Sequence, residues 1–130
     1  MEGRLRLLLD THVMIWALEA PDRLDSKARA AIESRENKVF VSVVSPWELA
    51  IKGPREGLRL PDKLETEMDR RGFDLLPVLF RHMEPIGSMP YHHRDPFDRM
   101  LVAQALVDGL TIVTADRKMT NYQVSLLPAI

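Results

Sequence analysis

Apolar and polar positions divide this chain into two kinds of segment. Short runs rich in Leu, Val and Ile occupy residues 4–9, 38–43, 73–78 and 110–114. Runs that are apolar along their whole length, rather than at every second position, are typical of buried parallel strands. Residues 122–127 predict a further strand at the edge of the same sheet.

Helical patterns fill the intervals between these strands. Each predicted helix either starts at Ser, Asp or Pro or stops shortly before Gly or Pro. The helices cover residues 12–19, 26–35, 45–52, 61–71 and 95–107, with a helical turn at 80–86. Residues 53–61 and 87–94 read as loops. Alternating strands and helices predict an α/β fold with a parallel sheet and crossover helices.

Four acidic residues sit next to the predicted strands and helix starts. Asp10 directly follows the first strand, Glu48 lies just past the second, and Asp116 just past the strand at 110–114. Asp98 lies in the first turn of the helix at 95–107. The carboxyl ends of parallel strands share one edge, so these carboxylates can converge there. Carboxylates packed together repel one another, and a hard divalent cation such as Mg²⁺ or Mn²⁺ removes that repulsion.

Helix capping is the competing interpretation of the same residues. Asp10 could be a helix N-cap, and Ser45 with Glu48 has the spacing of a capping box. Asp95 could likewise cap the helix that holds Asp98 in its first turn. Capping accounts for each residue separately but not for their common placement at one sheet edge. The pattern as a whole therefore favours a shared acidic metal site.

Basic residues flank the last two acidic positions. They are candidates for holding a phosphate backbone: Arg94, Arg99, Arg117 and Lys118. Asp116 could instead simply form an ion pair with the adjacent Arg117 or Lys118, or cap a short turn. Charged residues at helix starts are usually solvated and have no further role. These four are candidates only because they lie beside the proposed acidic metal site.

Composition narrows the class of protein. At 130 residues the chain has the length of one domain, and we predict a single domain over residues 1–130. No apolar run approaches the roughly 18 residues of a membrane span, and the start lacks a signal-peptide pattern. The absence of cysteine excludes disulfides and thiolate metal sites, and fits a cytoplasmic protein. A formal net charge of −1 gives no global attraction to nucleic acid, so any such binding must use a local basic patch.

Two apolar surfaces are candidates for contacts with other chains. They are the predicted helix-one face with Val13, Trp16 and Ala17, and the segment from Trp47 to Ile51. Burial in the core is the ordinary role for residues of this kind.

Four stretches, residues 7–18, 42–52, 93–105 and 114–117, resemble PIN domains, and more closely the VapC-type toxins of bacterial toxin–antitoxin pairs. The resemblance spans nearly the whole chain. It implies a three-layer α/β fold with a five-stranded parallel sheet, four central strands plus an edge strand, flanked by helices. It also implies an Mg²⁺- or Mn²⁺-dependent endoribonuclease that forms homodimers and is inhibited by a small cognate antitoxin.

The family's acidic ligands carry over to Asp10, Glu48, Asp98 and Asp116. Two hydroxyl residues, Thr11 and Thr114, match positions that line the same pocket. The role of Asp95, as an extra ligand or a plain cap, stays open.

These observations favour a metal-dependent endoribonuclease that cleaves single-stranded or looped RNA, whose backbone can enter a pocket that a rigid duplex reaches poorly. Two alternatives come from other classes. One is a receiver-like or phosphoryl-transfer protein that uses Asp10 as acceptor, although Thr11 and His12 provide no second acidic group beside it. The other is a non-catalytic interaction module whose acidic residues only cap helices.

Overall fold

A parallel sheet of five strands forms the centre of the fold. The computed structural model describes residues 4–91 and 95–130. The strands are β1 (Arg6–Leu9), β2 (Lys38–Ser42), β3 (Phe73–Leu76), β4 (Thr111–Thr114) and β5 (Leu126–Pro128). Their order is β3-β2-β1-β4-β5, and every neighbouring pair is parallel. The predicted α/β class and five-stranded parallel sheet are confirmed, with β1 in the middle.

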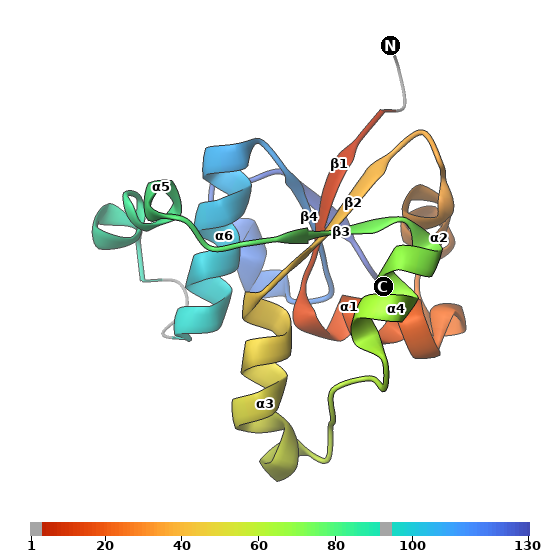
Figure 1. The fold of residues 1–130 in the computed structure, drawn as a ribbon. Coiled ribbons are helices and arrows are strands. Elements are labelled where there is room, and N and C mark those ends of the chain that lie inside the picture. The colour runs from red at the N-terminus through yellow and green to blue at the C-terminus, as the bar shows by residue number, and fades with distance from the viewer. Residues whose placement is uncertain (1–3, 92–94) are drawn as a thin grey trace.

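Helices cover both faces of this sheet (Figure 1). The α-helices are α1 (Thr11–Glu19), α2 (Ser26–Glu33), α3 (Val44–Glu56), α4 (Leu64–Arg71), α5 (Phe80–Met83) and α6 (Pro96–Asp108). Short 3-10 helices cover Pro21–Arg23, Ile86–Ser88 and Arg117–Asn121. In Figure 1, α1, α2 and α4 lie to one side of the strands and α5 and α6 to the other, while α3 extends away from the sheet.

The side chains of β1 alternate between two hydrophobic clusters. Leu7 and Leu9 pack in the cluster with α1, α2 and α4, whereas Leu8 packs in the cluster with α6. All three are fully buried, and each contributes roughly 1.5–3 kcal/mol relative to an exposed leucine. A strand buried on both faces needs no polar alternation, which is the reason for its uniformly apolar sequence.

Capping residues set several helix boundaries. Asp95 accepts hydrogen bonds from the amides of Phe97 (2.8 Å) and Asp98 (3.3 Å), and Gly109 ends α6 in the left-handed conformation, as predicted. The N-cap of α2 is Asp25, which accepts from the Lys27 amide at 3.1 Å, one residue before the predicted Ser26.

Helix α3 is longer than its sequence predicts. It begins at Val44 and runs through Gly53 and Pro54 to a left-handed Gly57. Gly53 does not end the helix. A Cβ at that position would lie 2.6 Å from the Leu58 carbonyl oxygen, so the glycine permits the chain after the helix to fold back closely. Pro54 lies in the last turn, where the missing amide hydrogen costs a single backbone bond.

None of the helices in residues 4–91 and 95–130 combines the length and the apolar character needed to cross a membrane.

Candidate metal centre

Asp10 is the most enclosed of the predicted acidic residues. It directly follows β1, and its side chain is the N-cap of α1, with Oδ1 accepting from the Val13 amide at 2.9 Å. The second oxygen, Oδ2, accepts a hydrogen bond from the Thr114 hydroxyl at the end of β4. Thr114 Oγ1 in turn accepts from the Asp116 amide at 3.0 Å. A single threonine thus joins the chain segments that carry Asp10 and Asp116.

The electrostatic state of Asp10 reflects its burial. Only 9% of the residue is exposed. Burial raises the pKa of Asp10 above its ordinary value, and the negative charge of Asp116 raises it further. The hydrogen bonds from Thr114 and Val13 and the nearby His12 oppose this increase without cancelling it. Without a cation, the ionised form of Asp10 therefore destabilises the folded protein at neutral pH.

Glu48 belongs to a second group of hydrogen-bonded residues. Its Oε1 lies 2.6 Å from the Thr11 hydroxyl, which donates to it. Thr11 Oγ1 is also 3.1 Å from the Ser45 hydroxyl, and both threonine and serine are buried. Because α3 already begins at Val44, Glu48 lies beyond the first turn and its two oxygens face Thr11 and Lys52. The capping-box interpretation of Glu48 is therefore wrong.

Lys52 links Glu48 to Asp95. Its Nζ lies 3.1 Å from Glu48 Oε2, one helical turn earlier, and in direct contact with Asp95 Oδ2. The ammonium is also 5.1 Å from the centre of the Phe97 ring. Burial works against the charge of Lys52, but the hydrogen bonds to Asp95 and Glu48 outweigh it and raise the lysine's pKa. Partial burial would raise the pKa of Asp95. The hydrogen bonds that Asp95 accepts from Lys52 and from the amides of Phe97 and Asp98 outweigh this effect and lower its pKa.

The structure gathers the predicted acidic residues at one edge of the sheet in two groups. Glu48, Asp95 and Asp98 form the first, with one carboxylate oxygen from each within 4.8 Å of the others. Asp10 and Asp116 form the second, joined through Thr114. The groups are neighbours, because Thr11 directly follows Asp10 and donates to Glu48. This arrangement agrees with the prediction that the acidic residues lie at one edge of the sheet.

The donor set suits a hard divalent cation. The gathered groups are carboxylate and hydroxyl oxygens, which are the ligands that Mg²⁺ and Mn²⁺ prefer over nitrogen or sulfur. A cation beside Asp10 would also relieve the unfavourable burial of its charge. Among the described residues, the carboxylates that lie close enough together to share an ion are those of Glu48, Asp95 and Asp98, and Lys52 contacts two of them.

The predicted phosphate-binding residues differ in their positions. Arg117 and Lys118 are exposed beside Asp116, which accepts from the Lys118 amide at 2.9 Å. Arg94 lies outside the described residues. Arg99 is buried, and its guanidinium donates to the carbonyl oxygens of the segment before α6, at Ile86 (3.0 Å), Met89 (3.1 Å) and Pro90 (2.8 Å). The prediction that Arg99 contacts RNA is contradicted by this burial, because its donors are used within the fold.

Comparison with known proteins identifies the fold. The family model of the PIN domain matches residues 7–124. The chain belongs to the PIN domain family. It is 28% identical over 128 residues to a protein named Ribonuclease VapC22 from Mycobacterium tuberculosis, covering 90% of this chain and 92% of that one.

Solved structures show the same PIN fold at low sequence identity. One of them is the structure of VapBC2 from Rickettsia felis bound to a DNA fragment from its promoter. A chain of that structure is 13% identical to this chain, with a TM-score of 0.71. The match covers 97% of this chain and 100% of that one. A chain of the DNA-bound VapBC structure from Salmonella typhimurium is 18% identical with a TM-score of 0.64, covering 95% and 98% of the two chains.

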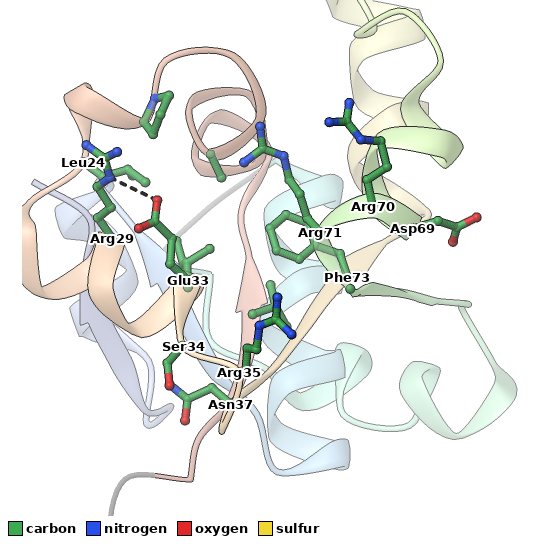
Figure 2. A pocket seen from close by; sticks show the side chains of 15 residues that line it. Leu24, Arg29, Glu33, Ser34, Arg35, Asn37, Asp69, Arg70, Arg71 and Phe73 are labelled. Carbon is green, nitrogen blue, oxygen red and sulfur yellow. Dashed lines mark hydrogen bonds and ion pairs between the residues drawn. The ribbon is translucent and has the colours of Figure 1, made fainter.

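A cavity in this PIN domain lies away from the acidic residues. Its volume is about 490 Å³, and it lies between α2, α4 and the first residues of β2 and β3. Figure 2 shows arginines around it, among them Arg29, Arg70 and Arg71. These cations already have partners: Arg29 pairs with Asp22 and Glu33, Arg70 pairs with Glu67, and Arg71 donates to the Leu18 carbonyl. None of the predicted site residues within 4–91 and 95–130 lines this cavity.

The sequence pattern predicts no role for Lys52 and only a capping role for Ser45. Lys52 lies four residues after Glu48, a spacing that pairs opposite charges on one helix face and could have identified this contact. Its contact with Asp95, 43 residues away, has no signal in the local pattern. Ser45 was considered only as a cap, whereas its hydroxyl supports Thr11.

The burial of Asp10 predicts a pH-dependent effect of its removal. We expect Asp10→Asn to raise the melting temperature of the metal-free protein by a few degrees at pH 7, because the neutral amide still accepts from Val13 and no longer buries a charge. The folded-state pKa lies above 3.8, so the destabilisation is absent below pH 3.8 and grows as pH rises toward the folded-state value. The difference between the two proteins should therefore shrink in acid.

Thermal melting in EDTA across a pH series measures this effect, with the exposed Asp62→Asn as the matched control. A metal-free wild type that is more stable than Asp10→Asn at pH 7 would contradict the account.

Proposed function

We propose that this chain is the toxin of a toxin–antitoxin pair and an endoribonuclease that depends on Mg²⁺ or Mn²⁺. One observation carries the proposal. Two hydrogen-bonded groups of carboxylates meet at the carboxyl edge of the sheet in a member of the PIN family. The names of VapC22 and of the VapBC structures support the toxin and ribonuclease assignments. We also propose that residues 1–130 form a single PIN domain.

The acidic residues take distinct roles in the proposed reaction. Asp10 and Asp98 are the principal metal ligands, and Asp116 binds the ion directly or through water. Glu48 is a ligand or the base that positions the attacking water. A bound divalent ion lowers the pKa of that water and neutralises charge on the phosphoryl oxygens. No side-chain nucleophile is required.

The hydroxyl residues hold these carboxylates in place. Thr114 donates to Asp10, and Thr11 donates to Glu48, so each acidic side chain keeps one oxygen fixed. The second interaction of each, with Val13 or with Lys52, then sets its orientation. Fixed donors of this kind reduce the reorganisation that metal and substrate binding would otherwise require.

The substrate we propose is single-stranded or looped RNA. The chain has a formal net charge of −1, so attraction to RNA must be local. Arg117 and Lys118, exposed beside Asp116, are the described residues placed to contact a phosphate backbone next to the scissile bond. We expect the protein to act in the cytoplasm, together with a small cognate antitoxin.

The metal-site proposal predicts which conservative variants lose activity. We expect Asp10→Asn, Asp98→Asn and Glu48→Gln to lose RNA cleavage by about 100-fold or more while remaining folded, because each keeps its shape and loses its charge. Asp62→Asn, an exposed carboxylate in the loop after α3, should cleave like wild type.

Cleavage of a fluorescent single-stranded RNA in Mn²⁺ and in EDTA measures both activity and metal dependence. Wild-type rates in EDTA, or full activity of Asp10→Asn, would exclude the proposed centre and favour a non-catalytic interaction module.

The toxin assignment predicts a growth phenotype. Expression of the wild-type chain without a partner should arrest a bacterial host, because uncontrolled RNA cleavage stops protein synthesis, and expression of Asp10→Asn should not. Colony counts after induction measure the difference, with protein levels matched by immunoblot. Equal tolerance of both forms would remove the toxin claim and leave the nuclease claim standing.

One of the two apolar surfaces remains open to a partner chain. Val13 and Ala17 are buried in the core, which contradicts the prediction that they contact another chain. Trp47 and Ile51 on α3, by contrast, are 58% and 51% exposed. Trp47 also lines an apolar hollow of about 840 Å³ with residues of α5 and α6.

We infer that a second copy of the chain covers this surface and forms a homodimer. Ile51→Glu should shift the protein toward monomer, because a charge in an apolar interface must be desolvated without a partner. Leu60→Glu, in the loop after α3 and 41% exposed, is the matched control. Light scattering after size-exclusion chromatography measures the mass, and a monomeric wild type at micromolar concentration would contradict the inference.

A further inference from the structure

Lys52 occupies a central position among the acidic residues of the first group. Its ammonium contacts Asp95 Oδ2 and lies 3.1 Å from Glu48 Oε2. Only 26% of its side chain is exposed, and the ring of Phe97 lies 5.1 Å from Nζ. These contacts come from α3 and from the start of α6, so the lysine is held from two sides.

The remaining oxygens of its two partners are also engaged. Glu48 Oε1 accepts from Thr11 at 2.6 Å, and Asp95 Oδ1 accepts from the amide of Phe97 at 2.8 Å. Each carboxylate is therefore held in one orientation, with one oxygen bonded to the fold and the other to Lys52. The third member of the group, Asp98, has a carboxylate oxygen within 4.8 Å of oxygens of Glu48 and Asp95.

A divalent ion and this ammonium cannot use the same oxygens at once. An Mg²⁺ or Mn²⁺ ion bound to Glu48 and Asp95 would lie roughly 2 Å from their oxygens, and hence within a few ångströms of Nζ. Two cations at such a distance repel strongly in a partly buried site. An ammonium bonded to both carboxylates therefore competes with a divalent ion for these two oxygens.

We propose that Lys52 is a built-in second cation, so that this nuclease binds a single divalent ion. The ion is held by Asp10, Asp98 and Asp116, whereas Glu48 and Asp95 are held by Lys52. The inference rests on the proposed function and deepens it, because it makes Glu48 a positioned carboxylate that acts on water rather than a metal ligand. Lys52 is a positioning residue in this arrangement.

Counting bound Mn²⁺ tests the proposal without RNA or turnover. The free ion is measured by its electron paramagnetic resonance signal while Mn²⁺ is titrated into the purified protein. Wild type should bind one ion per chain. Lys52→Met should bind two, because removal of the ammonium opens the group of Glu48, Asp95 and Asp98, whose oxygens already lie within 4.8 Å of one another.

Two further variants separate charge from structure. Lys52→Arg keeps a positive charge and should remain at one ion per chain. Lys27→Met removes an exposed lysine from α2 and should also remain at one. Two ions bound by the wild type, or a single ion bound by Lys52→Met with unchanged affinity, would overturn the proposal. No Mn²⁺ bound by any of these proteins would instead overturn the metal centre of the proposed function.

A second comparison applies if Lys52→Met does not fold. Glu48→Gln should keep the affinity for its single Mn²⁺ within about threefold, whereas Asp98→Asn should weaken it by about tenfold or more. Equal weakening by both variants would show that Glu48 is a ligand and that the assignment of Lys52 is wrong.

Discussion

The parallel pairing of β1 with β2 and β4 is the constraint on which the candidate site depends. Leu7, Leu8 and Leu9 are fully buried, and each is paired with residues of both neighbouring strands. Since the strands run in one direction, the residues that follow them reach the same edge. A shift of one residue in the pairing of β1 with β4 would exchange the faces of β1 relative to β4 and move Asp10 away from Thr114.

Concentrating carboxylates at this edge has an electrostatic cost that the fold offsets in different ways. Asp10 has only neutral hydrogen-bond donors, and burial leaves its pKa raised. Asp95 instead has the ammonium of Lys52 and a lowered pKa. A divalent ion beside Asp10 would therefore offset an electrostatic cost that Lys52 already offsets at Asp95, which agrees with the proposed division of labour.

Capping a helix and taking part in the site are compatible for two of these residues, because a carboxylate has two oxygens. Asp10 caps α1 with Oδ1 while Oδ2 faces Thr114, and Asp95 caps α6 with Oδ1 while Oδ2 faces Lys52. A strong cap signal in the sequence therefore gave no reason to reject a site. Glu48 differs because its helix begins earlier than the cap pattern indicates, which leaves both of its oxygens for the site.

The sequence by itself determined the parts of the protein that depend on near neighbours. Apolar runs specified buried parallel strands, and the cap at Asp95 and the glycine at 109 specified the limits of α6. Only the tertiary structure decided that Arg99 is buried, that Gly53 accommodates the Leu58 carbonyl, and that Lys52 meets Asp95 across 43 residues. Periodicity and capping act over about four residues. The partner of a charged side chain depends on which helices the sheet brings together, and no local pattern records that.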